Sequence, residues 1–240
     1  MNLVINTLGL LCYNEGVNLQ IYTSKISDGS MKIIDDKNRL EVMENRNKFL
    51  AKNFIDPSHT VLVKITYETD DFCKYKVVGI NDRGDGFTKP STITADALCT
   101  NDYQTALFLP IADCIGAVLY SLKHHAFMVS HLGRHSLEQN GGFNSVKYFV
   151  SAFNLNPSEI KVWMSPAVGK DSYPLHKFEG KSLHEVAQEQ FERAGIQPNH
   201  IEHEGIDVAK HKDYYSHSSF LKGMQIDDGR FAIVATMLKK

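Results

Sequence analysis

The sequence predicts an α/β protein, and two kinds of pattern support this prediction. Short runs of β-branched and aromatic residues, such as Ile115–Ser121, recur along the chain and are typical of buried strands. Longer segments place apolar residues three and four positions apart, which is the spacing of an amphipathic helix. Together they indicate about ten strands and three helices, without an internal repeat or a linker. We therefore expect a single domain, residues 1–240.

The first third of the chain is expected to form several strands and one helix. The turn signals Asn14-Glu15-Gly16 and Asp28-Gly29 separate the first strands, because glycine accommodates positive φ angles. A flexible polar loop from Asn81 to Pro90 is a candidate lid or insertion. The predicted strands are Leu3–Cys12, Val17–Thr23, Met31–Ile34 and Thr60–Thr66, and the predicted helix is Asn38–Asn53.

The remaining two thirds alternate strands with two clear helices. Cys114 lies between two buried strands, and the next strand ends on His131. Gly195 provides a stop for the second helix. The predicted strands are Ala106–Pro110, Ile115–Ser121, Ala126–Ser130, Ile160–Met164, Ile201–Ile206 and Phe231–Met237, and the helices are Gly142–Phe153 and Ser182–Ala194.

Composition excludes several classes of function. The formal net charge is −2 and no basic run occurs, so we expect no nucleic-acid partner. No apolar run approaches the roughly 20 residues of a membrane-spanning helix, and the first residues do not resemble a signal peptide. The 4 cysteines are widely scattered, which favours reduced thiols over a disulfide framework. These features predict a cytoplasmic protein.

Cys114 and His131 are the strongest candidates for a reactive centre. They lie at the ends of predicted strands, and thiolate and imidazole serve both as zinc ligands and as a nucleophile–base pair. With one further ligand they would form a catalytic zinc site; without it, His131 could generate a thiolate nucleophile at Cys114. Asp113 either orients the histidine or caps a turn, and we favour the turn. Gly133 permits a sharp bend, after which Arg134 offers a positive group for an anion.

Other polar residues have simpler interpretations. Spacing alone places Asn45-Arg46 on a solvated helix face, and His124-His125 falls where a hairpin should turn. His217 and Arg230 could form an anion site near a strand end. The other histidines lie in polar surroundings and are expected at the surface: His59, His176, His184, His200, His203 and His211.

Six segments, in the correct order over nearly the whole chain, resemble the family long labelled multicopper polyphenol oxidoreductase, or laccase domain. Its members are regarded as zinc-dependent enzymes of purine nucleosides, and some bacterial members are called peptidoglycan editing factors. The matching segments are Glu44-Asn45-Arg46 (ENR), Ala95–Thr100 (ADALVT), Ala112-Asp113-Cys114 (ADC), Pro166–Gly169 with Tyr173 (PSIG…Y), Tyr215-Ser216-His217 (FFSxR) and Gly229–Ala232 (GRxA).

The chain also departs from this family at three positions. The first zinc-ligand histidine of the family ends a QVHG-type strand, and Thr66 stands in its place in Lys64-Ile65-Thr66-Tyr67. The family's HAGWRG is replaced by His131–Ser136, without the tryptophan, and its FSxRR arginines by His217-Ser218-Ser219. A threonine hydroxyl is a poor zinc ligand, so we expect weak zinc binding or none unless Glu68 or Asp70 compensates.

The resemblance implies a layered fold in which mixed β-sheets pack together and helices lie outside, as in toxin deamidases with a Cys–His pair. It implies an enzyme that acts on purine nucleosides, by phosphorolysis with phosphate or by deamination of adenosine. Cys114 and His131 would be the catalytic residues and the zinc ligands, with Thr66 at the third ligand position. Arg46, Arg134, His217 and Arg230 would bind phosphate or ribose.

Two alternatives stay open. The missing histidine suggests a metal-free hydrolase or amidase, with Cys114 as nucleophile and His131 as base, acting on a peptidoglycan precursor or as a deamidase. The other alternative is a nucleoside-binding protein that has kept the fold and lost catalysis.

Overall fold

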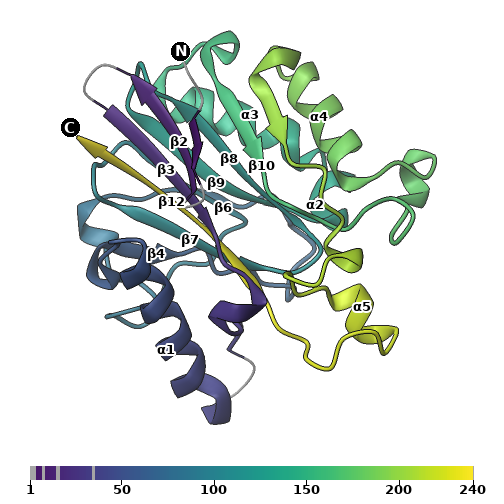
Figure 1. The fold of residues 1–240 in the computed structure, drawn as a ribbon. Coiled ribbons are helices and arrows are strands. Elements are labelled where there is room, and N and C mark those ends of the chain that lie inside the picture. Colours follow the sequence, from purple (N-terminus) through teal and green to yellow (C-terminus); the bar gives the residue numbers. More distant parts are fainter. Residues whose placement is uncertain (1–3, 7–8, 15–16, 34–35, 240) are drawn as a thin grey trace.

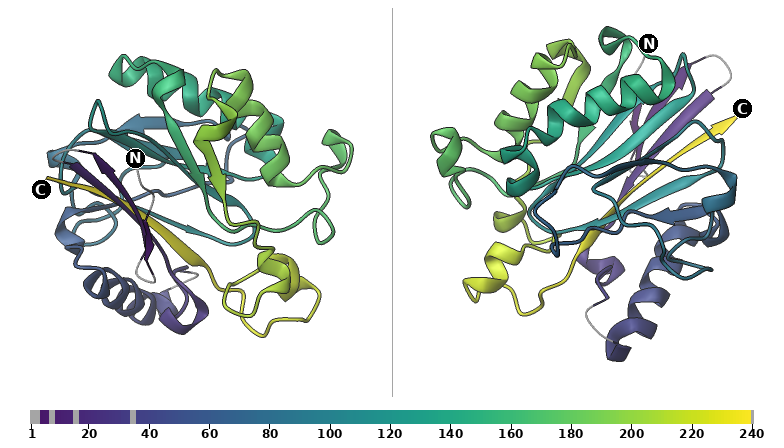
Figure 2. Two further views of the ribbon diagram at one scale, coloured as in Figure 1. Left: turned by 45° about the horizontal axis from the view of Figure 1, so that its top comes forward. Right: turned by 180° about the vertical axis from the view of Figure 1, so that it is seen from behind.

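Two six-stranded sheets pack face to face, with helices on both outer sides (Figure 1). The computed structural model describes residues 4–6, 9–14, 17–33 and 36–239. The views in Figure 2 show that α3 (Gly141–Phe153) and α4 (Leu183–Arg193) stay together on one side of the sheets, while α1 (Asp36–Lys52) lies on the opposite side. The predicted layered α/β fold is therefore confirmed.

The first sheet has the strand order β1-β2-β3-β12-β7-β4. Neighbouring strands are antiparallel except β4 and β7, which are parallel. The last strand of the chain occupies the middle of this sheet, between β3 and β7. The strands are β1 (Val4–Asn6), β2 (Gly9–Asn14), β3 (Val17–Thr23), β4 (Thr60–Leu62), β7 (Ala106–Ile111) and β12 (Phe231–Lys239).

The second sheet has the order β11-β10-β8-β9-β6-β5. Its two edge pairs, β10–β11 and β5–β6, are parallel, and the other pairs are antiparallel. The strands are β5 (Tyr75–Val77), β6 (Ala97–Thr100), β8 (Ile115–Ser121), β9 (Ala126–Leu132), β10 (Lys161–Met164) and β11 (Ile201–His203).

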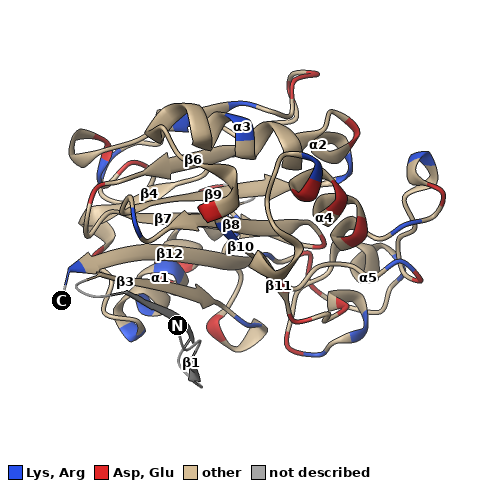
Figure 3. Cartoon of the chain, turned by 90° about the horizontal axis from the view of Figure 1, so that it is seen from above, with Lys and Arg blue, Asp and Glu red and all other residues tan. Residues whose placement is uncertain are grey.

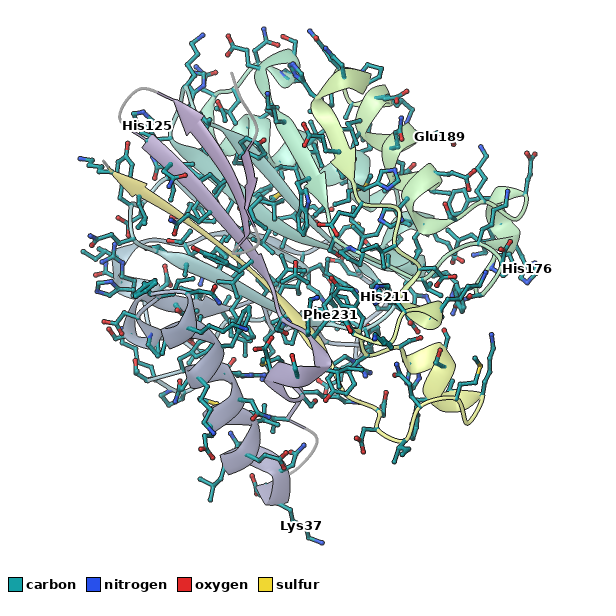
Figure 4. All side chains as sticks on the ribbon, viewed as in Figure 1. Lys37, His125, His176, Glu189, His211 and Phe231 are labelled. Carbon is teal, nitrogen blue, oxygen red and sulfur yellow. The ribbon has the colours of Figure 1, made fainter. Side chains whose placement is uncertain are left out.

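The main hydrophobic core lies between the two sheets. Ile233 of β12 and Val129 of β9 belong to it and are fully buried. Gly116 lets the sheets approach closely, since a Cβ atom there would come within 2.7 Å of Ile233 Cγ1. Phe231, at the start of β12, also lies in the interior, whereas Lys37 and His176 lie at the periphery (Figure 4). The sheets are therefore held together by side chains from strands that are distant in sequence.

The helices cover the outer faces of the sheets. On the first sheet, Phe49 and Leu50 of α1 pack with Phe108 and Val234. On the second sheet, α3 contributes Phe149 to the core. The helices are α1 (Asp36–Lys52), α2 (Arg134–Glu138), α3 (Gly141–Phe153), α4 (Leu183–Arg193) and α5 (His217–Leu221), and the single 3₁₀ turns are Ile26–Asp28, Pro57–His59, Ile80–Asp82, Pro157–Glu159, His176–Phe178, Pro198–His200 and Val208–Lys210.

Local chemistry explains where α4 begins. Ser182 precedes the helix, and its hydroxyl accepts a hydrogen bond from the Glu185 backbone N–H at 3.1 Å. The Glu185 carboxylate in turn accepts from the Ser182 N–H at 2.7 Å. This reciprocal pair satisfies two backbone donors that would otherwise be unpaired, as in a capping box.

Several predicted elements differ from the structure, among them the strand from Ile201, which ends at His203. Residues 31–33 form no strand, because Met31 lies under α1 and its N–H is bonded to Arg230 O at 2.8 Å; Ile34 lies outside the described residues. The strand from Thr60 ends at Leu62. The predicted strand Leu3–Cys12 overlaps β1 and β2, and residues 3 and 7–8 lie outside the described part.

The polar loop 81–90 packs against the first sheet. Asp85 is only 4% exposed, and its carboxylate accepts hydrogen bonds from the Thr92 N–H (2.9 Å) and hydroxyl (2.6 Å). Phe87 packs edge-on against Phe108. Backbone hydrogen bonds join the loop to β4, from Gly84 N–H to Thr60 O (2.9 Å) and from Leu62 N–H to Asp85 O (3.0 Å), so the loop is held against the first sheet.

Charged residues lie mainly on helices and loops, while the strands are mostly uncharged (Figure 3). Among the described residues, no helix has both the length and the apolar character needed to span a membrane.

Candidate functional site

A cavity of about 1200 Å³ opens where the two sheets meet α1, α2 and α5. Its wall includes Ile111 of β7 in the first sheet and His131 of β9 in the second. The residues that the sequence predicted as catalytic or substrate-binding all line it: Arg46, Cys114, His131, Arg134, His217 and Arg230. The fold therefore gathers into one space side chains that are up to 184 positions apart, from Arg46 to Arg230.

Cys114 and His131 meet beside Gly133. A Cβ atom on Gly133 would lie 2.8 Å from Cys114 Sγ and 3.2 Å from His131 Nε2, so both atoms face the same point. Burial raises the pKa of Cys114 to about 12, with the charge of Asp113 acting in the same direction. Burial lowers the pKa of His131 to about 4. At neutral pH the pair is therefore a neutral thiol and a neutral imidazole, not a thiolate and an imidazolium.

Asp113 anchors α5. Its carboxylate accepts hydrogen bonds from the Ser216 hydroxyl (2.6 Å) and from the Ser218 N–H and hydroxyl (both 2.7 Å). Its backbone φ is +67°, a conformation in which aspartate is tolerated better than most residues. This places Asp113 in the turn that we favoured, where it ties the cysteine loop to the start of α5.

A cluster of three basic side chains surrounds Asp228. Lys32 Nζ lies 2.9 Å from its Oδ2 atom, and both His217 Nδ1 and Arg230 Nη1 lie 2.8 Å from Oδ1. Burial acts to raise the pKa of Asp228, but the hydrogen bonds from Lys32, Arg230 and His217 outweigh it and hold the pKa well below its usual range. The ionised carboxylate thus fixes three cavity-lining basic groups in place. Lys32 was not singled out in the sequence.

Arg46 is buried, which contradicts the solvated helix face that its spacing predicted. It is 3% exposed, and its Nε and Nη2 atoms donate to Met31 O at 3.1 and 2.7 Å. The guanidinium lies 5.9 Å from the Phe87 ring centre and 5.6 Å from that of Phe108. Its Nη1 atom has no hydrogen-bond partner among the described residues. Burial lowers the pKa of Arg46 to about 10, so it stays charged at neutral pH.

Three rings form a row along the cavity wall, which we call the aromatic row: Tyr67, Phe72 and His135. Phe72 stacks on His135 at 4.8 Å with 21° between the planes, and Tyr67 is 6.0 Å from Phe72. Gln139 fixes the loop that carries Tyr67 and Phe72, because its side chain accepts from the Phe72 N–H (2.9 Å) and donates to Asp70 O (2.5 Å). No sequence spacing predicted this arrangement.

The model of the family described as "Multi-copper polyphenol oxidoreductase laccase" matches residues 12–181. The chain belongs to this family. Two solved structures share its fold: the hypothetical protein YfiH of Bacillus licheniformis (19% identity, 95% of each chain covered, TM-score 0.79) and YlmD of Geobacillus stearothermophilus (17%, 98% of each chain, 0.81). A Neisseria meningitidis protein is also similar (15%, 94% and 96% covered, 0.69). No curated protein matches the chain.

The laccase-family name points to metal, and the donor set in this member can be tested against it. Among the described residues, no group of three or more His, Cys, Asp or Glu side chains is placed to hold a metal ion. Cys114 and His131 supply two donors. Thr66 does not line the described cavity, and its hydroxyl accepts a hydrogen bond from the Glu68 N–H at 3.2 Å. The residues present do not fit a three-ligand zinc site or a multicopper centre.

The other histidines of this laccase-family chain lie away from the cavity. His124 and His125 form the turn between β8 and β9, as predicted. His184 was expected at the surface but is 8% exposed: its Nε2 atom lies 2.9 Å from Ser165 O, and its ring stacks on His203. Burial lowers the pKa of His184 to about 4, so it is a neutral core histidine.

Proposed function

We propose that the protein binds a purine nucleoside together with phosphate in this cavity and cleaves the nucleoside by phosphorolysis. The charge of the cavity wall carries the proposal. Among the described residues, seven lysines and arginines line it and only one acid, Asp113, although the whole chain has a net charge of −2. A cavity of one sign of charge attracts a ligand of the opposite sign. The seven are Lys32, Arg39, Arg46, Lys64, Lys89, Arg134 and Arg230.

Phosphate has two natural partners in this wall. The free Nη1 donor of buried Arg46 is fixed in direction by the bonds of its other nitrogens to Met31 O. Arg230 and Lys32 are held by Asp228. Donors oriented in advance lose little freedom when they bind an oxyanion, and charge-assisted bonds to phosphate are among the strongest in proteins.

The base of the nucleoside has a partner in the aromatic row. Stacking on an aromatic ring is worth about 1–3 kcal/mol per base and tolerates any base. Tyr67 ends the row and is 65% exposed, which leaves a ring available for a planar ligand. A nucleoside with its base on this row would direct its ribose into the cationic interior.

Phosphorolysis requires little covalent chemistry from the protein. A phosphate oxygen attacks C1′ of the ribose while the bond from C1′ to the base nitrogen breaks, and the departing base takes up a proton. The positive wall would hold the attacking phosphate, and the neutral Cys114 and His131 offer uncharged hydrogen-bonding groups nearby. Deamination of adenosine, the other reaction of this substrate class, uses no anionic co-substrate and gains nothing from the cationic wall.

The test is hypoxanthine release from inosine by the purified protein, with and without phosphate. We expect turnover only with phosphate present, and sulfate should inhibit competitively. Inosine formation from adenosine, assayed in parallel, would instead support deamination. Absence of both reactions would reject the enzyme proposal; nucleoside binding without turnover would then support a binding protein.

A second candidate is the metal-free cysteine hydrolase or amidase. It is favoured by the meeting of Cys114 Sγ and His131 Nε2 beside Gly133. It is opposed by the pKa values of about 12 and about 4, which leave the thiol without the ionisation that such nucleophiles use. Rapid alkylation of Cys114 near neutral pH would favour this candidate over the first.

A further inference from the structure

Asp96 lies directly opposite His131 across the ladder between β6 and β9. The register pairs Ala97 with Ser130, and His131 N–H donates to Asp96 O at 2.8 Å, which continues the ladder by one residue. Residues directly opposite each other in an antiparallel pair project their side chains on the same face, with Cβ atoms about 5 Å apart. The carboxylate and the imidazole are therefore neighbours on the inner face of the second sheet.

Both side chains are buried and both retain one unpaired polar atom. Asp96 is 1% exposed and His131 is 4% exposed. Within the part of the chain that the structure describes, Asp96 Oδ1 and His131 Nδ1 have no hydrogen-bond partner. A buried polar atom that stays unpaired costs about 1–3 kcal/mol, so such atoms in folded proteins usually serve a purpose. A carboxylate oxygen accepts and an imidazole N–H donates, so these two atoms complement each other.

The second polar atom of each side chain, Asp96 Oδ2 and His131 Nε2, has neighbours of its own. Asp96 Oδ2 accepts a hydrogen bond from the Lys74 N–H at 3.0 Å, which orients the carboxylate. His131 Nε2 and Cys114 Sγ both lie beside Gly133, 3.2 and 2.8 Å from the position that a Cβ atom would take there. The order along the site is thus Asp96, His131 and Cys114, with the histidine between an acid and a thiol.

We propose that Asp96 is a positioning residue that accepts a hydrogen bond from His131 Nδ1–H, either after a small rotation of one side chain or through one bridging water. This bond fixes the imidazole in the tautomer that carries its proton on Nδ1. Nε2 is then an acceptor, directed at the cavity and at Cys114. An acid that orients a histidine in this way sets which nitrogen can accept a proton.

This inference goes beyond the proposed function, because it concerns the state of His131 and holds for any reaction at the site. Its test therefore has to measure the tautomeric state of His131 directly. In ¹⁵N-labelled protein near neutral pH, long-range ¹H–¹⁵N correlation spectra distinguish the two neutral tautomers of histidine. The His131 signal is assigned by its loss in His131→Gln.

In the wild-type protein we expect the proton on Nδ1. In Asp96→Asn we expect it to move to Nε2, because the amide oxygen takes over the bond from the Lys74 N–H and the amide nitrogen then faces Nδ1. The matched control is Asp85→Asn. Asp85 is equally buried (4% exposed), also has an unpaired Oδ1, and also binds a backbone N–H through Oδ2 (Thr92, 2.9 Å). The Asp85→Asn variant should lose about as much stability as Asp96→Asn, and the tautomer of His131 should be unchanged in it.

The kinetic arm uses phosphorolysis, if the wild type performs it. Asp96→Asn should lower kcat at least about tenfold with KM nearly unchanged, as expected for a group that acts through the histidine. A wild-type histidine with its proton on Nε2 would overturn the inference, even if Asp96→Asn did not fold. So would an unchanged tautomer in folded Asp96→Asn. Failure of phosphorolysis would remove the proposed function and leave the tautomer result intact.

Discussion

Gly133 lies so close to Cys114 that a Cβ atom on it would come within 2.8 Å of the sulfur. The sulfur is therefore enclosed by backbone on one side while the other side faces the cavity. Burial raises the pKa of Cys114 to about 12, and a thiol reacts with alkylating agents only through its thiolate.

The first prediction is that Cys114 resists iodoacetamide. At pH 7.5 it should react at least about tenfold more slowly than Cys73, a partly exposed cysteine outside the cavity wall. Because the thiolate fraction rises about tenfold per pH unit below the pKa, the rate should still be increasing at pH 10. Mass spectrometry of the two peptides over time measures both rates. Saturation of the rate below pH 8 would contradict the prediction.

The second prediction concerns the free donor of Arg46. Arg46→Lys should weaken the binding of inorganic phosphate at least about tenfold, since an ammonium cannot both satisfy Met31 O and present a second fixed donor. Arg39→Lys is the control: Arg39 lines the same cavity, but it is exposed and pairs with Asp36. Its effect should stay within about twofold. Isothermal titration calorimetry with phosphate measures the affinity of both variants. Equal losses of phosphate affinity would contradict the prediction, because they would show that the donor geometry of Arg46 has no special part in phosphate binding.

The third prediction tests the aromatic row. Phe72→Leu should weaken inosine binding by roughly 1 kcal/mol or more, about fivefold, and leave phosphate affinity unchanged. Leucine keeps the apolar contact but removes the ring that stacks on His135. Phe178→Leu is the control, because Phe178 is half-buried and does not line the cavity. Titrations with inosine and with phosphate are compared. If phosphate affinity fell by the same factor, the loss of inosine affinity would come from a disturbed loop and not from lost stacking.

The fourth prediction is a dependence of stability on acid. The pKa of Asp228 is depressed, so its ionised form stabilises the fold above the unfolded-state pKa of about 3.9. That contribution is lost as pH falls through the lower pKa of the folded state. Between pH 5 and pH 2 the melting temperature of the wild type should therefore fall more steeply than that of Asp228→Asn. Asp227→Asn, on the neighbouring residue, should follow the wild-type curve. Parallel curves for all three proteins would mean that the basic cluster contributes no acid-sensitive stability.

The fifth prediction concerns zinc. Tyr67 lines the cavity with Cys114, whereas Thr66 does not, and the Thr66 hydroxyl binds the Glu68 N–H. Tyr67→His should raise zinc affinity at least about tenfold by adding a third ligand, and Thr66→His should change it little. Competition with a chromogenic chelator measures both. The reverse order would show that residue 66 faces the site, as the sequence resemblance implied.

Patterns within a single segment predicted most of the fold. The strands Val17–Thr23 and Ile115–Ser121 agree with β3 and β8, because alternating or continuous apolar runs report burial directly. The helix predicted at Gly142–Phe153 differs from α3 by one residue. Their positions at strand ends and turns brought Cys114, His131, Arg134, His217 and Arg230 forward, and the family resemblance added Arg46. The structure places all six in one cavity.

What the sequence could not show depends on partners far along the chain. Arg46 was expected in solvent because its helix position lies off the apolar stripe; its burial depends on Met31 O and on rings from two other elements. Asp96 gained a possible role only through the register that sets it opposite His131. No spacing rule anticipates which strands become neighbours, so such pairs are visible only in the folded molecule.

The position of β12 has a consequence for the synthesis of this protein. β12 follows every other described strand in the sequence, yet it lies between β3 and β7 and bonds to both. Until the ribosome has translated Phe231–Lys239, the facing edges of β3 and β7 lack their common neighbour. Unpaired strand edges associate readily with other chains. The nascent chain is thus prone to aggregate until β12 has been synthesised, and the cavity that Arg230 helps to line is completed in the same step.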